Sequence, residues 1–270
     1  MRDDNYPLAS SPDEINRLRI QAESLAGEAA IMLDRIGIEA GMSCLDLGCG
    51  AGGITDLLAA RVAPGGRVVG MDVDEFSLAA ARSWADGLGL RGVTFRAGDI
   101  FDNDLAPESF DLVHLRYVIT TIGRHDDVVR SALRLVKPGG ALALQEADAE
   151  GIDAYPKNPA FDRLKDVLLS VFVKIGADPF AGRRAFRLLR DAGLSDVDFR
   201  VCAACARADD DLSDYLPQTV LSVRAAILKF GLMTDPEIDA AVAACRAHLV
   251  DPNTITTTST VFQAWGRKDE

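Results

Sequence analysis

The stretch "CLDLGCGAGG", from Cys44 to Gly53, constrains the fold of this chain more than any other part of it. A short apolar run leads into four glycines within six residues, and a helical pattern follows. Glycine lets the backbone turn tightly and lets a ligand approach the main chain closely. The last six residues of the stretch match the pattern G-x-G-x-x-G, which is typical of the first strand–turn–helix unit of dinucleotide-binding proteins. The stretch therefore predicts an α/β fold with a ligand beside this turn.

Strand and helix patterns alternate on both sides of this turn. After a helical lead-in over 12–36, which begins with a Pro-Asp-Glu start signal, apolar spacing predicts strands at 43–48, 67–73, 93–99, 110–118 and 141–146, and helices at 53–63, 75–88 and 125–136. Such alternation is typical of a parallel sheet covered on both faces. Ligands in such folds bind beyond the carboxyl ends of the strands.

The pattern changes after residue 146. It predicts helices at 160–176 and 180–192, strands at 197–205 and 256–266, and, between these strands, helices at 213–230 and 235–249. A helical pair is therefore inserted before the last strand. We expect an N-terminal helical arm (1–40), a Rossmann-like core (41–205), an inserted helical lid (206–252) and a last core strand (253–270).

Composition and charge exclude several classes of partner. The 270 residues carry a formal net charge of -12, and no run of Lys or Arg stands out, so we expect no binding to nucleic acid or to membrane surfaces. No apolar stretch approaches the length of a membrane span, and the first residues lack a signal core, so we expect a cytoplasmic protein. The five cysteines fit reduced thiols. Cys202 and Cys205 form a C-x-x-C without a second ligand pair nearby, so we interpret them as strand residues and expect no metal.

Three acidic residues bear on which ligand the glycine turn holds. Asp46 lies inside the first strand, where a carboxylate would repel a pyrophosphate but would hold a cationic ligand such as S-adenosylmethionine (SAM). Asp72 ends the second strand and can accept hydrogen bonds from both hydroxyls of a ribose, which NAD and SAM share. Asp99 ends the third strand, where it can accept from an adenine amino group, with Ile100 against the ring. Each of the three also has a purely structural interpretation, as a cap or a surface acid.

"CLDLGCGAGG", "VVGMDVD", "FRAGDIF", "FDLVHLRYVI" and "LRLVKPGGALAL", in this order, resemble the successive motifs of class I SAM-dependent methyltransferases over about residues 42–146. The flanks, "YPLASSPDEINRLRIQ" and "VFQAWGRK", resemble bacterial small-molecule methyltransferases, many of them in natural-product pathways. The resemblance implies a seven-stranded, mostly parallel sheet whose last strand is antiparallel. It also implies a set of SAM-binding residues: Tyr6 in the arm, Asp46, Gly48, Cys49, Gly50 and Gly52 in the first turn, Asp72 and Val73, Gly98, Asp99 and Ile100, and His114 and Arg116.

The activity implied is transfer of a methyl group to an O, N or C atom of a small-molecule acceptor. The expected partners are that acceptor and, as an open question, a second copy of the chain. A hydroxyl acceptor needs a general base, and His125 or Glu146 would supply it, with Asp148 as a further acid at the same sheet edge. His248 is interpreted as structural. Two alternatives stay open: a cyclase or isomerase that only holds SAM, and an NAD-dependent oxidoreductase, which Asp46 and the motif series disfavour.

Overall fold

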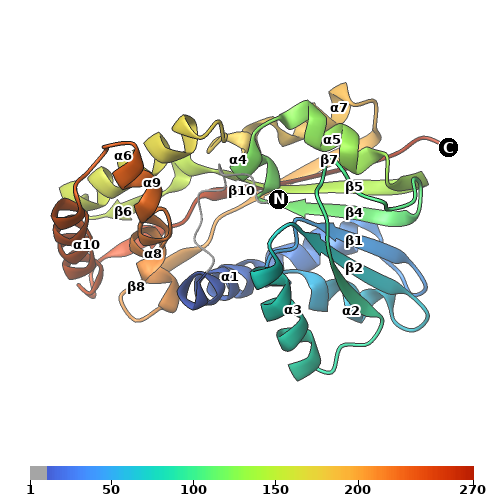
Figure 1. The fold of residues 1–270 in the computed structure, drawn as a ribbon, viewed down its shortest axis with the longest axis horizontal. Helices are drawn as coiled ribbons and strands as arrows, with labels where there is room; N and C mark the ends of the chain where they lie inside the picture. The colour runs from blue at the N-terminus through green and yellow to red at the C-terminus, as the bar shows by residue number, and fades with distance from the viewer. Residues whose placement is uncertain (1–10) are drawn as a thin grey trace.

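A twisted, seven-stranded sheet forms the centre of the chain in the computed structural model, which describes residues 11–270 (Figure 1). Its strand order is β3-β2-β1-β4-β5-β10-β7. The strands are β1 (Ser43–Leu47), β2 (Arg67–Asp72), β3 (Val93–Ala97), β4 (Phe110–Arg116), β5 (Val136–Asp148), β7 (Ser195–Cys202) and β10 (Thr260–Arg267). Neighbours from β3 to β5 pair in parallel, and β10 runs antiparallel between β5 and β7. The expected α/β fold with an antiparallel last strand is confirmed.

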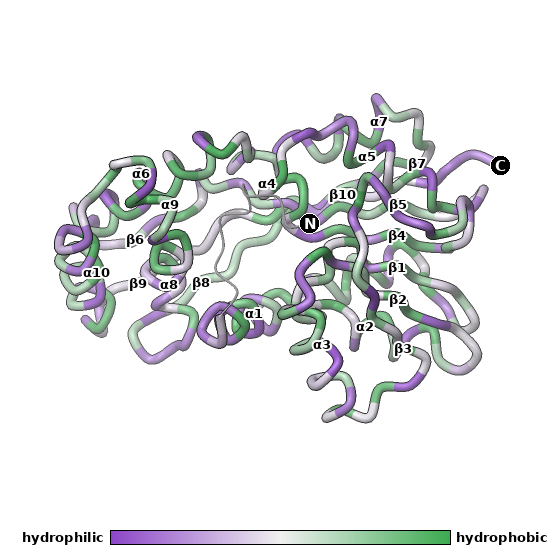
Figure 2. The backbone as a smooth tube through the Cα atoms, viewed as in Figure 1, coloured by the Kyte–Doolittle hydropathy of each residue, from purple (hydrophilic) through white to green (hydrophobic). Residues whose placement is uncertain are grey.

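Helices cover both faces of this sheet. One face carries α1 (Pro12–Ile36), α2 (Thr55–Val62) and α3 (Glu75–Gly87), and the other carries α4 (Val118–Ile122), α5 (His125–Leu133) and α7 (Ala185–Asp191) (Figure 1). Two apolar cores fill the spaces between these layers. Apolar residues run along the central strands, and the helices alternate between apolar and polar positions (Figure 2). This is the pattern that a sheet buried on both faces requires.

The helical lead-in has the bounds that the sequence predicts, and its caps explain why. The Ser11 side chain accepts a hydrogen bond from the Glu14 N–H, and Pro12 occupies the first helical position. Gly37 ends the helix in the left-handed conformation, at φ 80°. Between these caps, a stripe that includes Met32 and Leu33 is buried against the sheet.

An outer lobe stands beyond the carboxyl ends of the parallel strands (Figure 1). It is formed by α6 (Pro159–Lys174), α8 (Tyr215–Ser222), α9 (Arg224–Lys229), α10 (Asp235–Leu249) and a three-stranded sheet of β6 (Asp153–Tyr155), β9 (Ile255–Thr257) and β8 (Cys205–Arg207). This lobe has its own apolar core. The small sheet was not predicted, because its strands are three residues long and come from distant parts of the chain.

Three predicted elements in or next to the outer lobe, one helix and two strands, differ from the structure. The expected single helix over 213–230 breaks at Val223, whose φ of -101° and ψ of 12° leave the helical range between α8 and α9. The expected strands 197–205 and 256–266 each bend and enter both sheets, as β7 then β8 and as β9 then β10. At the bend, the Thr258 N–H donates to the Ala204 carbonyl oxygen at 3.0 Å, so the two strands stay paired. A continuous two-stranded ribbon therefore joins the sheets.

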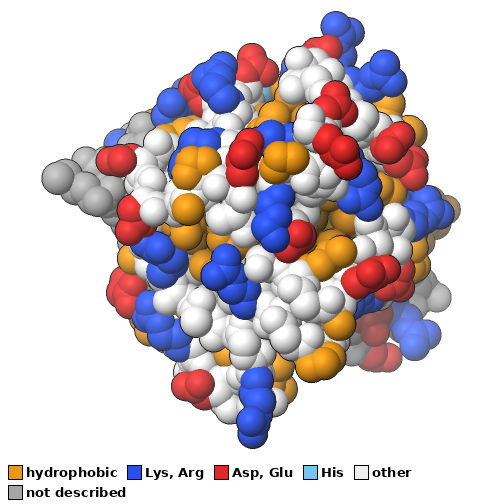
Figure 3. All heavy atoms as spheres, turned by 90° about the vertical axis from the view of Figure 1, so that its right-hand side faces the viewer, with side chains coloured by type: hydrophobic (Ala, Val, Ile, Leu, Met, Phe, Trp, Pro, Cys, Tyr) orange, Lys and Arg blue, Asp and Glu red, His pale blue; other side chains and the backbone are white. Residues whose placement is uncertain are grey.

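The molecular surface at the end of the sheet opposite the outer lobe mixes positive and negative side chains with small apolar patches (Figure 3). On the face that Figure 3 shows, no extended basic area stands out. Across residues 11–270, every helix is too short or too polar to cross a membrane.

Candidate functional site

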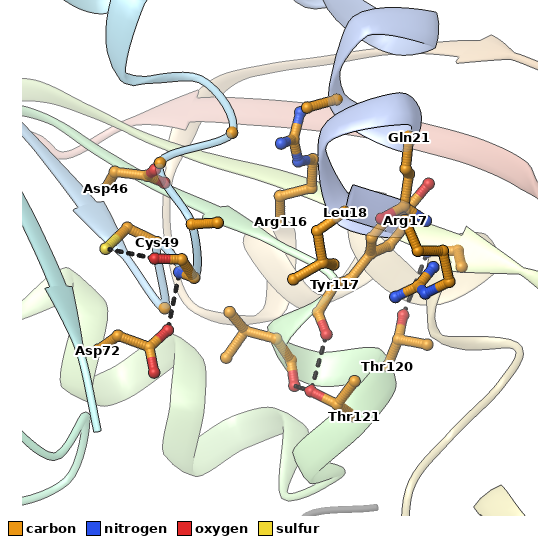
Figure 4. Close-up of a pocket in the computed structure, with 18 of the residues that line it drawn as sticks. Arg17, Leu18, Gln21, Asp46, Cys49, Asp72, Arg116, Tyr117, Thr120 and Thr121 are labelled. Atoms are coloured by element: carbon orange, nitrogen blue, oxygen red, sulfur yellow. Dashed lines mark hydrogen bonds between the residues drawn. The ribbon is translucent and has the colours of Figure 1, made fainter. Parts of the chain in front are cut away.

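A cavity lies between the large sheet and the outer lobe, at the carboxyl ends of β1 to β5. Its remaining walls come mainly from α1, α4, α6 and α8, with contributions from α2 and α3, and the close-up in Figure 4 shows part of its lining. The cavity volume of about 280 Å³ is near the lower end of the range for small-molecule sites, roughly 300–1,000 Å³. It lies where a ligand is expected in an open α/β sheet.

The glycine turn forms the floor of this cavity. Gly48 has φ 79°, and a Cβ there would lie 2.5 Å from Cγ2 of Val118, so the position tolerates only glycine. Gly50 has φ 50°, and its N–H donates to Oδ2 of Asp72 at 2.8 Å. The turn is therefore fixed to the end of β2, with its backbone open to a ligand.

Asp72 is held in place by two main-chain donors. Its Oδ2 accepts from Gly50, and its Oδ1 accepts from the Asp74 N–H at 2.9 Å. Burial raises the pKa of this carboxyl, and the two N–H donors oppose that rise. Because each oxygen keeps a second lone pair and the residue lines the cavity, Asp72 can accept from a ligand diol.

Asp46 begins a buried polar chain across the α1 face of the sheet. Its Oδ1 lies 2.8 Å from Nδ1 of His114, and the His114 Nε2 lies 2.9 Å from Oε1 of Gln145. His114 is fully buried and is absent from the cavity wall, whereas Asp46 lines it. The structure therefore places His114 behind Asp46, where it can orient the carboxylate and cannot touch a ligand directly.

Arg116 lies in the cavity wall with a buried nitrogen unsatisfied. Its Nη1 has no hydrogen-bond partner among residues 11–270. A Cβ on Gly53 would lie 1.8 Å from its Nη2, so the guanidinium lies directly over that glycine (Figure 4 labels Arg116 close to the turn). A buried guanidinium nitrogen without a partner is costly, and a guanidinium is the group that best binds a carboxylate.

The other expected cofactor residues divide into three groups. Cys49, Val73, Gly98 and Ile100 line the cavity. Asp99 does not: it is exposed, and its Oδ1 accepts from the Phe101 N–H at 2.7 Å. Tyr6 lies outside the described residues. The Cys49 thiol is buried, and this burial raises its pKa well above the ordinary value, so it stays protonated and unreactive.

Neither expected base lies in the cavity wall. The carboxylate of Glu146 faces away from α1 and accepts from the N–H groups of Ile119 and Thr120 at 3.0 and 2.9 Å, so it caps the start of α4. Burial raises its pKa to about 7. His125 lies at the start of α5, and its Nε2 is 2.9 Å from Oδ2 of Asp178. Both side chains support the segment that forms one wall, and the geometry gives no support to either as a base.

The sequence did not indicate the two tyrosines of the site. Tyr117 lines the cavity in a left-handed conformation, at φ 59° and ψ 20°, which is strained for a residue with a side chain. Tyr215 of α8 also lines it, and its hydroxyl accepts a hydrogen bond from Nε2 of Gln21 at 3.0 Å. An aromatic residue after a strand was the only available signal for Tyr117, and α8 is too far along the chain for any local pattern to link it to this cavity.

Comparison with known proteins agrees with this geometry. A family model described as a methyltransferase domain matches residues 38–167. The demethylmenaquinone methyltransferase of Lactobacillus johnsonii is 28% identical over 56% of this chain and 60% of its own length. The chain spans less than two thirds of the length of the curated relatives that it matches first.

Two solved structures share the fold. A SAM-dependent methyltransferase from Aquifex aeolicus superposes with a TM-score of 0.55 and 22% identity, over 72% of this chain and 93% of that one. The cyclase SpnF superposes with a TM-score of 0.56 and 19% identity, over 90% of this chain and 81% of that one. Residues 38–167 therefore match a methyltransferase-domain model, and the chain shares its fold with solved SAM-dependent methyltransferases.

Proposed function

We propose that this protein transfers the methyl group of SAM to a small-molecule acceptor. The observation that carries the proposal is the charge arrangement around the glycine turn. Two of the carboxylates that line the cavity, Asp46 and Asp72, lie beside the turn, and Arg116, whose Nη1 is buried without a partner among the described residues, lines the same cavity. Two carboxylates beside the turn would repel a pyrophosphate, and they suit a ligand that carries an ammonium group, a ribose and a carboxylate.

The residues present fit such a ligand group by group. Asp46 would accept from the ammonium, Arg116 would pair with the carboxylate, and Asp72 would accept from the ribose hydroxyls. Gly98 and Ile100 would lie against the base, and the side-chain-free surface of Gly48 and Gly50 would let the ligand approach the main chain. His114 would act by orienting Asp46.

SAM, when bound, supplies a methyl group that is already activated by the sulfonium. The remaining work of the chain is to align the acceptor and to exclude water. The part of the cavity wall that faces the outer lobe holds no carboxylate or imidazole among the described residues. We therefore infer that positioning provides most of the rate acceleration, on an acceptor that is already nucleophilic.

We further propose that the arm (1–40) and the inserted lid (206–252) close over the cavity and select the acceptor. Hydrogen bonds between the arm and the lid support this proposal. Gln21 of α1 bonds to Tyr215 of α8, and the Glu14 side chain accepts from the Ser222 hydroxyl. The core segments 41–205 and 253–270 would then bind SAM largely without the lid.

Calorimetry with SAM, S-adenosylhomocysteine and NAD tests the cofactor assignment. We expect the first two to bind and NAD not to bind. Tight NAD binding with no SAM binding would overturn the proposal. Incubation with SAM and a panel of small aromatic and polyketide acceptors should yield S-adenosylhomocysteine in proportion to methylated product.

A second candidate is a cyclase that holds SAM without consuming it. It is favoured by the lack of a base in the lobe-facing wall and by the likeness of the fold to that of SpnF. Product formation without any S-adenosylhomocysteine would select this alternative over methyl transfer.

A further inference from the structure

The part of the cavity wall that faces the outer lobe differs in chemistry from the glycine-turn part. We call it the lobe wall; it is formed by Tyr117, α4, the residues after β5, α6, α8 and Ser259. Its surface is mainly apolar, with contributions from Ile122, Ile152, Leu169 and Phe172. Among the described residues, the lobe wall contains no charged side chain.

The buried charge that α1 contributes to the cavity wall is already neutralised. Arg17 lines the cavity, but it forms a two-point ion pair with Glu14, at 2.8 Å from Nε and 2.6 Å from Nη2. Both side chains are about 95% buried, at 5% exposure each. Removing either charge from such a pair is expensive, so Arg17 is poorly suited to serve as the counter-ion of an acceptor.

Half of the hydroxyl groups of the lobe wall are committed to the protein. The Thr120 hydroxyl donates to Glu146 at 2.7 Å, and those of Thr121 and Thr219 donate to main-chain carbonyls. Among the described residues, the hydroxyls that can still donate to a ligand are those of Tyr215, which accepts from Gln21, and of Tyr117 and Ser259, which line the same wall.

The Tyr117 hydroxyl is a permanent donor. Burial raises its pKa well above the ordinary value, so it keeps its proton throughout the physiological range. Its strained backbone is held by a hydrogen bond from its N–H to the Gln145 carbonyl at 2.8 Å. Ser259 lies at the bend of the ribbon, so this pair spans the junction between the core and the outer lobe.

We propose that the acceptor is an uncharged, largely apolar molecule with a neutral oxygen that the Tyr117–Ser259 pair and Tyr215 bind. A charged acceptor would lose its hydration in this wall without gaining a counter-charge. An apolar body with one carbonyl or hydroxyl oxygen would instead match both the carbon surface and the free donors. The inference rests on the proposed methyl transfer and specifies the acceptor of that same site.

Four bicyclic probes that share one ring system test the charge and the oxygen separately. They are 1-naphthol, naphthalene, 1-naphthylmethylamine as a cation and 1-naphthoic acid as an anion. Their binding is measured by calorimetry on the full chain saturated with S-adenosylhomocysteine. We expect 1-naphthol to bind at least about tenfold more tightly than either charged probe. Equal or tighter binding of a charged probe, or no binding of 1-naphthol, would overturn the inference.

Three variants test which side chains of the lobe wall contact the acceptor. Leu169→Asp should raise the affinity for the ammonium probe by about tenfold over Leu169→Asn, which has nearly the same shape and no charge. Tyr117→Phe should weaken 1-naphthol binding by about three- to tenfold and leave naphthalene binding unchanged. Equal losses for both probes would mean that Tyr117 only shapes the wall. Equal affinities of the two Leu169 variants for the ammonium probe would mean that Leu169 does not face the acceptor.

Failure of this inference and failure of the proposed function give different results. If S-adenosylhomocysteine itself does not bind, the proposed function is wrong. If it binds and a charged probe is preferred, methyl transfer stands and only the acceptor class is wrong.

Discussion

Gly53→Ala tests the role of Arg116 without changing any functional group. Gly53 is not one of the glycines with a left-handed backbone, so alanine can adopt the local conformation. The new methyl group would lie 1.8 Å from Nη2 and 3.0 Å from Cζ of Arg116, and its next neighbour, Cβ of Ala22, is at 3.5 Å. The guanidinium is the flexible end of a long side chain, so it must move while the fold remains.

The expected size of the effect follows from the interaction that is lost. A charge-assisted hydrogen bond between the guanidinium and a ligand carboxylate contributes about 1.5–3 kcal/mol. Its loss should raise the Kd for S-adenosylhomocysteine roughly 10- to 150-fold. Arg116→Ala should have an effect of similar size.

Calorimetry on wild type, both single variants and the double variant completes the test. If Gly53→Ala acts through the guanidinium, it should add almost nothing in the Arg116→Ala background. Gly27→Ala is the matched control, because a Cβ there meets nothing within 4 Å and the residue lies on the exposed side of α1. Unchanged affinity in Gly53→Ala, or equal losses in both backgrounds, would refute the role of Arg116.

Three further outcomes are expected. Asp72→Ala should weaken S-adenosylhomocysteine binding by about 1.5–3 kcal/mol, measured by calorimetry, since it removes the acceptor of the ribose hydroxyls; unchanged affinity would contradict that role. Because the pKa of Glu146 rises from 4.5 to about 7 on folding, the folded state binds more protons in this window, and the free energy of unfolding should fall as the pH rises through it. Urea titrations at several pH values should show this fall, on the order of 3–4 kcal/mol at most, and it should be flattened in Glu146→Gln. His125→Ala should keep most of the methyl-transfer rate and the wild-type pH profile, since the side chain lies outside the cavity wall. If the wild-type rate shows an inflection near neutrality, and the variant loses that inflection together with roughly 10²–10⁴-fold of the rate, His125 is the base.

The fold was predictable because its main signals are local. The caps of α1, the turn around Gly48 and the alternation of strands and helices each lie within a few residues of one another. The antiparallel last strand was not visible in the residues themselves and came from the resemblance. The small sheet and the helix break at Val223 escaped prediction because long-range packing in the outer lobe sets them.

The sequence predicted which strand ends contribute to the site, but not which side chains face the cavity. Asp46, Asp72 and Arg116 were expected at the sheet edge and do line the cavity. Gln145 and Glu146 are neighbours in β5, so their side chains point to opposite faces of the sheet. Gln145 joins the buried chain through His114, and Glu146 caps α4. A position at the right edge does not say which face a side chain takes.

The bent ribbon has a consequence for engineering the acceptor range. Since β8 and β9 continue directly into β7 and β10, the outer lobe is not a cassette attached by two loose loops. A chimera that exchanged only the helices of the outer lobe would combine the small sheet of one parent with the helices of another. If the chains are instead joined inside β7 and β10, the bends at 203–204 and 258–259 are transplanted together with the outer lobe. Ser259 then stays with the lobe that it came from.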